Sequence, residues 1–211
     1  MMTSKVHFNN KNQTNTIQMI KTRIHLAVSA NGKSTEIDTY LPVLYLAGPV
    51  RNAPRWHEEV IRKLLVLNVG VHVACPAHHL SADLMSLVES DKGYPTFDRS
   101  ASWENHYLDC AAKNGVIMFW LPGEIEHKEF SQKKYAHKTM LALGKWLEKA
   151  KADQGIHLVI GTDGLFPEWS SIKHQLEVDY PEVIVNTSLE DTVAKAVRMT
   201  RVYLESSAGF F

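Results

Sequence analysis

The stretch LPVLYLAGP, residues 41–49, is an unbroken apolar run that ends in Gly-Pro. A strand that is half exposed alternates apolar and polar residues, whereas a strand that is covered on both faces is apolar throughout. The same pattern returns in GVIMFWLP at 115–122. These two runs therefore predict central strands of a parallel sheet with helices on both faces.

Helical and strand patterns alternate on either side of these runs. WHEEVIRKLLVLN at 56–68 has apolar residues at a helical period, and RSASWENHYLDCAAKN at 99–114 is predicted as a helix with Ala, Leu and Cys on its buried side. Further strands are predicted at 70–76, 156–164 and 181–188, and further helices at 81–90, 131–151, 168–179 and 189–205, with Ser131 and Ser188 as N-caps. This rhythm predicts an α/β, doubly wound, five-stranded parallel sheet in the flavodoxin-like order 2-1-3-4-5, a Rossmann-like three-layer sandwich.

The N-terminal residues 1–21 are polar and rich in Asn, Gln and Thr, and they lack the apolar centre of a signal peptide. We interpret them as a mobile tail before a single domain at 22–211. RIHLAVS at 23–29 alternates like a strand, and the Asn31-Gly32 turn signal after it predicts an N-terminal hairpin that joins the main sheet.

Composition excludes several classes of protein. The 211 residues include 23 Lys+Arg and 23 Asp+Glu, so the formal net charge is zero and there is no bulk charge for a nucleic-acid polymer or an anionic membrane. No apolar run approaches the roughly 20 residues that cross a bilayer. Cys75 and Cys110 have no metal-type spacing, and the adjacent His78 and His79 have no third ligand at a zinc-like spacing. These features predict a cytoplasmic protein with reduced cysteines and no metal.

A ligand in a doubly wound sheet binds beyond the carboxyl ends of the strands, where the strand order reverses. That rule directs attention to Gly48-Pro49 and to 121–123, which follow the two central strands. GTDG at 161–164 has glycines that could admit a phosphate, but its spacing matches no dinucleotide or P-loop motif. A plain strand-exit loop is therefore favoured there.

The helix that contains HKTMLALGKW, 137–146, has an unusual inward face. Its predicted inward residues are Thr139, Ala142, Leu143 and Trp146, which include no acid and no base. Acids do cluster around the preceding predicted helix, at Asp98, Glu104 and Asp109, where a solvated or capping role is the default. The chain also lacks the G-x-S-x-G motif of a serine nucleophile.

Three segments together resemble the nucleoside 2-deoxyribosyltransferase family: LYLAGPV at 44–50, SWENHYLDCAAKNGVIMFWLP at 102–122 and TMLALGKWL at 139–147. The similarity is to a divergent branch with a W-E helix, an I-x-F-W-x-P strand and an E-F-G-x-W helix. In that family a Glu carboxylate attacks the anomeric carbon of a nucleoside and forms a glycosyl-enzyme, as in retaining glycosidases. The resemblance implies a nucleoside or nucleotide ligand, no cofactor, and a homo-oligomer.

The resemblance places an alanine where the family has its nucleophile. If Gly144-Lys145-Trp146 matches the family's G-x-W, the nucleophilic Glu corresponds to Ala142. Catalysis is then lost or altered and a nucleotide-shaped pocket remains. Alternatively, the inserted segment 123–134 supplies the acid, and Glu129 echoes the family's E-F. The match to Ala142 is favoured, because about 26 residues separate Glu129 from the next strand.

The resemblance also implies roles for individual residues. Glu104, Asp98 and Glu129 would be the acids; Tyr45, Gly48 and Pro49 would line the pocket; Trp56 and Trp120 would stack on the base; Thr139 and Ala142 would lie near the sugar. Three functions remain open: an N-glycoside hydrolase or transferase, a nucleotide sensor on an inactive scaffold, and an interaction module whose pocket is vestigial.

Overall fold

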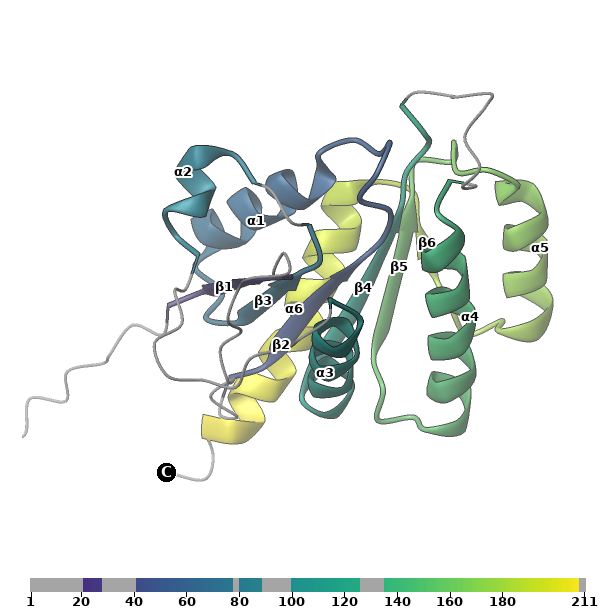
Figure 1. The fold of residues 1–211 in the computed structure, drawn as a ribbon. Coiled ribbons are helices and arrows are strands. Elements are labelled where there is room, and N and C mark those ends of the chain that lie inside the picture. The colour runs from purple at the N-terminus through teal and green to yellow at the C-terminus, as the bar shows by residue number, and fades with distance from the viewer. Residues whose placement is uncertain (1–20, 28–40, 78–79, 89–99, 126–134, 209–211) are drawn as a thin grey trace, which may run out of the picture.

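A computed structural model describes residues 21–27, 41–77, 80–88, 100–125 and 135–208 (Figure 1). Its strands form one six-stranded sheet in the order β1-β3-β2-β4-β5-β6, and every neighbouring pair is parallel. The strands are β1 (Arg23–Leu26), β2 (Val43–Ala47), β3 (His72–Cys75), β4 (Gly115–Leu121), β5 (Leu158–Thr162) and β6 (Val185–Asn186). The sheet is α/β with helices on both faces, as predicted.

The five predicted strands have the predicted order, because 2-1-3-4-5 corresponds to β3-β2-β4-β5-β6. A sixth strand, β1, extends the sheet beyond β3. Arg23 lies opposite His72 and Leu26 lies opposite Cys75, in parallel register. β1 and β2 are therefore not neighbours, since β3 lies between them. The predicted turn at 31–32, and with it the predicted hairpin, lies outside the described residues, as do residues 1–20 of the predicted tail at 1–21.

The predicted helices are present with shifted ends. They are α1 (Trp56–Leu67), α2 (Ala82–Met85), α3 (Ser100–Lys113), α4 (His137–Ala152), α5 (Trp169–Asp179) and α6 (Leu189–Ala208). α4 begins after Ala136, which has a left-handed backbone at φ 54°, so Ser131 is not its N-cap. Ser188 is the N-cap of α6: its Oγ accepts the N–H of Asp191 at 3.1 Å and donates to the Asp191 carboxylate at 2.7 Å.

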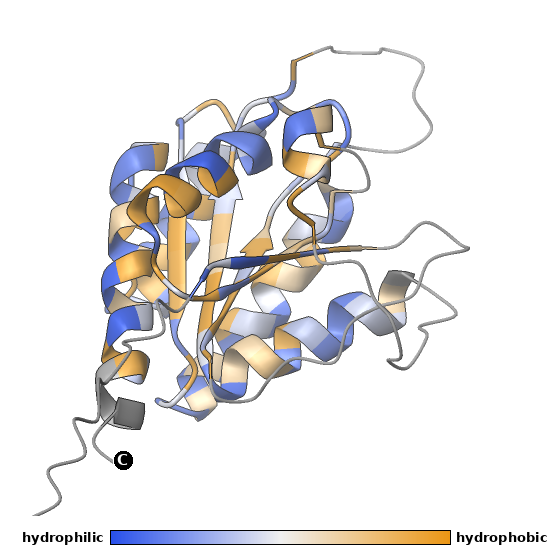
Figure 2. Cartoon of the chain, turned by 90° about the vertical axis from the view of Figure 1, so that its left-hand side faces the viewer, coloured by the Kyte–Doolittle hydropathy of each residue, from blue (hydrophilic) through white to orange (hydrophobic). Residues whose placement is uncertain are grey.

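Successive side chains of the central strands point to opposite faces and divide the core in two. Leu44, Leu46, Val116, Met118 and Trp120 pack with residues of α1 and α6. Tyr45, Ala47, Ile117, Phe119 and Leu121 pack with residues of α3, α4 and α5 on the other face. Figure 2 shows apolar strands between helices that are apolar inward and polar outward. The three-layer sandwich is confirmed.

Close packing of α6 on the sheet depends on a glycine in β5. A Cβ added at Gly161 would lie 2.0 Å from Oγ1 of Thr192 in α6.

No helix in the described part of the chain is long and apolar enough to cross a bilayer.

Candidate functional site

The strand order reverses between β2 and β4. The chain leaves β2 toward α1 on one face of the sheet, and it leaves β4 toward α4 on the other face. Loops therefore diverge at the carboxyl ends of these two strands, which is where doubly wound proteins bind ligands. The described side chains at this position come from β2, α3 and α4.

Tyr45 and Glu104 are brought together on the α3 side of this position. The Tyr45 ring is 4% exposed, and burial first, followed by the negative charge of Glu104, raises the pKa of its hydroxyl well above 10. Glu104 is half-buried at the start of α3. The Tyr45 hydroxyl has no hydrogen-bond partner among the described residues. A tyrosine donor and a carboxylate acceptor are therefore neighbours.

Trp103 lies beside Tyr45 and is fully buried. The two ring centroids are 6.2 Å apart, and Trp103 is 4.4 Å from the ring of Tyr107. Its indole nitrogen is buried and has no hydrogen-bond partner in the described part of the molecule. A buried donor without an acceptor costs about 1–3 kcal/mol, so such groups are uncommon in folded proteins. Sequence patterns give no sign of this feature, because an unpaired indole depends on tertiary contacts.

The inward face of α4 has the composition predicted from the sequence. Thr139, Leu143 and Trp146 are buried, and Ala142 is half-buried against the same side-chain cluster as Tyr45. No acid or base lies among these four described residues. At the edge of the sheet where the strands have their carboxyl ends, α4 therefore presents the methyl group of Ala142, which lies close to the buried cluster that contains Tyr45.

Trp56 and Trp120 lie on the opposite face from Tyr45. Trp56 is 2% exposed, its indole N–H donates to the carbonyl oxygen of Pro49 at 3.0 Å, and its ring stacks on His57 at 3.6 Å. Trp120 is also buried, in the cluster of α1 and α6. The two indoles proposed to stack on a base are thus packed against protein and separated from Glu104 by the sheet.

Gly48 allows this packing at the end of β2. A Cβ at this position would lie 2.6 Å from Cζ2 of Trp56 and 2.5 Å from the carbonyl oxygen of Trp120. Gly48 and Pro49 therefore contact Trp56 directly, with Pro49 as the hydrogen-bond acceptor. Their position fixes the start of α1 against the sheet.

Two predicted acids lie outside the described residues: Asp98 and Glu129. Asp109, the third acid of the cluster around α3, is exposed and forms an ion pair with Lys149 at 3.5 Å. Glu104 is consequently the predicted acid that the structure brings to Tyr45.

The exit of β4 is held by contacts that the sequence patterns did not predict. Both carboxylate oxygens of Asp163 accept the N–H of Gly123, at 3.1 Å and 3.0 Å. The Tyr135 hydroxyl donates to the carbonyl oxygen of Pro122 at 2.9 Å. These contacts join the loop after β5, and Tyr135 two residues before α4, to the end of β4, so they fix the edge of the sheet at the carboxyl ends of its strands.

Side chains of the GTDG loop accept hydrogen bonds from the backbone N–H groups that follow them. The Gly164 N–H donates to Oγ1 of Thr162 at 3.0 Å, and the Leu165 N–H donates to Asp163 at 2.9 Å. Thr162 in turn donates to the carbonyl oxygen of Leu121 at 2.7 Å. Because these N–H groups already have acceptors, the structure supports the strand-exit loop rather than a phosphate cradle.

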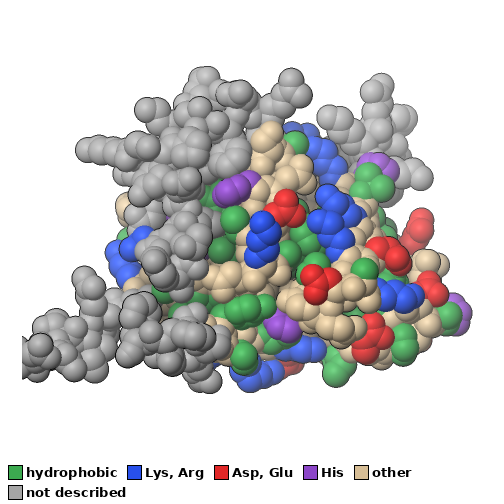
Figure 3. Space-filling view, turned by 90° about the horizontal axis from the view of Figure 1, so that it is seen from below, with side chains coloured by type: hydrophobic (Ala, Val, Ile, Leu, Met, Phe, Trp, Pro, Cys, Tyr) green, Lys and Arg blue, Asp and Glu red, His purple; other side chains and the backbone are tan. Residues whose placement is uncertain are grey.

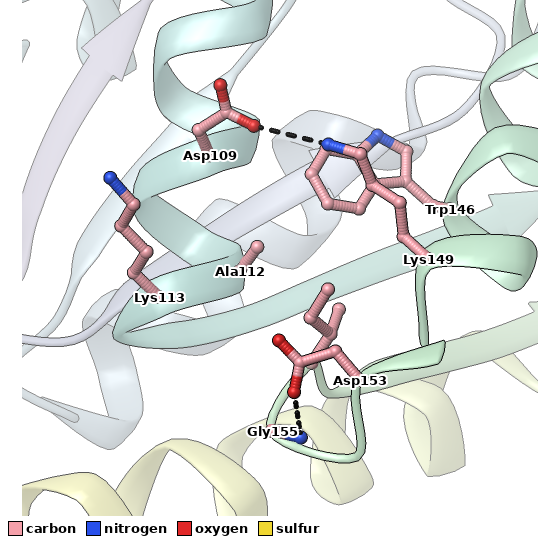
Figure 4. A pocket seen from close by; sticks show the side chains of 8 residues that line it. Asp109, Ala112, Lys113, Trp146, Lys149, Asp153 and Gly155 are labelled. Atoms are coloured by element: carbon pink, nitrogen blue, oxygen red, sulfur yellow. Dashed lines mark hydrogen bonds and ion pairs between the residues drawn. The ribbon is translucent and has the colours of Figure 1, made fainter. Parts of the chain in front are cut away.

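A hollow of about 310 Å³ lies at the opposite, amino edge of the sheet, between α3 and α4 (Figure 4). Lys149 Nζ lies 4.1 Å from the Trp146 ring centroid and pairs with Asp109, while Asp153 accepts the N–H of Gly155 at 2.9 Å. Figure 3 shows this side of the molecule with basic and acidic side chains interspersed. The charged groups of the hollow thus largely neutralise one another.

The described residues contain no group of three or more His, Cys, Asp and Glu side chains that could hold a metal ion. Cys75 and Cys110 are both free of disulfides. Burial raises the pKa of the Cys75 thiol to about 12, so it stays protonated at neutral pH.

No family model matches the chain, and no curated protein matches it either.

Proposed function

We propose that the protein binds a nucleoside or nucleotide at the carboxyl edge of the sheet, on the side of α3 and α4. The observation that carries this proposal is the pair formed by Tyr45 and Glu104, in which a buried tyrosine has no protein partner for its hydroxyl among the described residues. A hydroxyl donor beside a carboxylate acceptor suits the hydroxyl groups of a sugar. The resemblance to nucleoside 2-deoxyribosyltransferases supports the same class of ligand.

On this proposal, Ala142 decides the chemical outcome. A methyl group cannot attack an anomeric carbon, so the covalent glycosyl-enzyme of the resembled family cannot form at this position. The protein therefore holds its ligand with little or no exchange of the base. This is the behaviour of a nucleotide-binding or sensor protein on a transferase-like scaffold.

A second function is favoured by the position of Glu104. Its carboxylate is half-buried, and its negative charge helps to raise the pKa of the buried Tyr45 hydroxyl. Such a carboxylate can act as nucleophile or general acid, so N-glycoside hydrolysis or transfer through Glu104 is the alternative. The two functions differ in whether free base is released.

The test measures binding and base release on the same samples. The protein is titrated calorimetrically with ribo- and deoxyribonucleosides and their monophosphates, and free base is measured by chromatography. Ala142→Glu restores the acid, and Leu141→Glu adds the same acid to an exposed position of the same helix as a control. Binding without base release by the unaltered protein, with release by Ala142→Glu alone, supports the proposal.

Other outcomes separate the alternatives. Base release by the unaltered protein that disappears in Glu104→Gln would support the enzymatic function. If neither the unaltered protein nor Ala142→Glu binds any compound of the panel, nucleoside binding is refuted.

A further inference from the structure

Two buried histidines join the edge strand to the sheet. His25 of β1 and His72 of β3 have their Nε2 and Nδ1 atoms 2.8 Å apart, and their ring centroids are 5.0 Å apart at 44°. His25 is 4% exposed and His72 is 1% exposed. The contact is therefore an imidazole–imidazole hydrogen bond that water hardly reaches.

This hydrogen bond depends on the protonation of the pair. One nitrogen must donate an N–H and the other must accept it with a lone pair. When both rings are protonated, every ring nitrogen is a donor and both rings are positive. The contact is then repulsive, and it lies where solvent cannot screen it.

The surroundings of His25 oppose protonation. Among the described residues, the charges that lower the pKa of His25 are those of His72 of β3 and Arg23 of β1, and both favour the neutral ring. From α3, Tyr107 faces His25 at 5.6 Å between ring centroids, and His106 lies edge-on to Tyr107 at 5.3 Å. Burial first, and then the charges of His72 and Arg23, lower the pKa of His25 from 6.5 to about 3.

The strand that this pair stabilises is short and lies at the edge of the sheet. β1 has four residues and pairs within the sheet only with β3, apart from an isolated bridge between Ile24 and Val88. Its flanking backbone bonds are Arg23 N–H to Val71 at 2.9 Å and Ala27 N–H to Cys75 at 3.0 Å. Short edge elements open locally at a lower free energy than central strands.

We propose that the hydrogen bond between His25 and His72 is an acid-sensitive attachment that holds β1 on the sheet, and that protonation of both rings releases β1 from β3. Release would uncover the hydrogen-bonding edge of β3. The proposal does not depend on nucleoside binding.

Native-state hydrogen exchange at the amides of Arg23 and Ala27 tests the proposal. A histidine whose pKa falls from 6.5 to about 3 on folding raises the opening constant by about 25-fold between pH 7 and pH 5, after correction for intrinsic exchange. Amides of Leu44 and Leu46 in the central strand β2 serve as internal references for global opening. His25→Gln retains a hydrogen-bonding side chain but cannot titrate, so its β1 amides should show no such rise.

His57→Gln is the matched control, because His57 is another buried histidine but belongs to α1 on the opposite face of the sheet. The rise in the opening constant of the β1 amides between pH 7 and pH 5 should persist in this variant. An equal opening constant of β1 at pH 7 and pH 5 in the unaltered protein, or an undiminished rise in His25→Gln, would overturn the proposal. If His25→Gln does not fold, NMR titration of the His25 ring in the unaltered protein decides: a midpoint near 6.5 overturns the proposal, and a midpoint far below 6.5 supports it.

Discussion

The carboxylate of Asp163 accepts the backbone N–H of Gly123 with both of its oxygens, at 3.1 Å and 3.0 Å, and so ties the loop after β5 to the exit of β4. It also accepts the N–H of Leu165 at 2.9 Å. Hydrogen bonds to a charged group contribute about 1.5–3 kcal/mol, and less where the group is exposed to water, as Asp163 is.

We expect Asp163→Ala to lower the free energy of unfolding by about 2 kcal/mol, because two backbone donors lose their acceptor. Asp163→Asn keeps one acceptor oxygen and should lose about half as much. Urea denaturation measures both. Asp179→Ala, which removes another exposed carboxylate, should stay within about 0.5 kcal/mol of the unaltered protein; an Asp163→Ala variant of equal stability would refute the role of this contact.

Gly48→Ala should be strongly destabilising, because the added Cβ would lie 2.5 Å from the carbonyl oxygen of Trp120 and 2.6 Å from the Trp56 ring. Overpacking of this kind costs about 1–3 kcal/mol or more. Gly144→Ala in α4 is the matched control: nothing lies within 4 Å of its added Cβ, and alanine stabilises a helix by about 0.5–1 kcal/mol relative to glycine. Thermal denaturation should therefore shift in opposite directions for the two variants.

The central part of the fold could be predicted because its signals are local. Continuous apolar runs at 41–49 and 115–122 identify β2 and β4, and the alternation of helices with strands fixes a parallel sheet. β1 could not be placed in the same way. It pairs with β3, whose partner residues lie nearly fifty positions further along the chain, and no turn residue marks that contact. The Asn31-Gly32 turn signal favoured a hairpin instead.

The candidate site was predicted less completely, for a related reason. An inward α4 face without an acid follows from helical spacing, so the position of Ala142 beside the cluster of Tyr45 agrees with the sequence. The opposite orientations of Tyr45 and Trp120 also follow from strand alternation once the register is known. The role of Asp163 could not be predicted, because its partner Gly123 lies in another loop.

His57 should make the protein less stable in mild acid. Burial lowers the pKa of His57 to about 3, and its Nε2 has no hydrogen-bond partner among the described residues. The unfolded chain takes up a proton below pH 6.5 while the folded chain does not, so stability is lost as the pH falls from 6.5 toward 3. We expect a loss of about 2 kcal/mol between pH 7 and pH 5 from this residue.

Urea denaturation at the two pH values measures that loss. Between pH 7 and pH 5, the free energy of unfolding of His57→Gln should fall by about 2 kcal/mol less than that of the unaltered protein. The contribution of His25, which has the same sign, remains in both proteins. An identical pH dependence in the two proteins would show that His57 is protonated as easily in the folded state as in the unfolded chain.

Tyr45→Phe should separate ligand binding from stability. The Tyr45 hydroxyl has no partner among the described residues, so its removal leaves no protein group unpaired and the free energy of unfolding should change by less than about 0.5 kcal/mol. If the hydroxyl binds a nucleoside, the dissociation constant should rise about 5- to 10-fold, which corresponds to one lost hydrogen bond.

Tyr180→Phe is the contrasting control for that variant. The Tyr180 hydroxyl donates to the Glu148 carboxylate, where the end of α5 meets α4, so its removal should lower stability and leave nucleoside affinity unchanged. Calorimetric titration and urea denaturation of both variants give two independent readings. A Tyr45→Phe protein that binds as tightly as the unaltered chain would remove the tyrosine from the site, and a marked loss of stability would mean that its hydroxyl serves the fold.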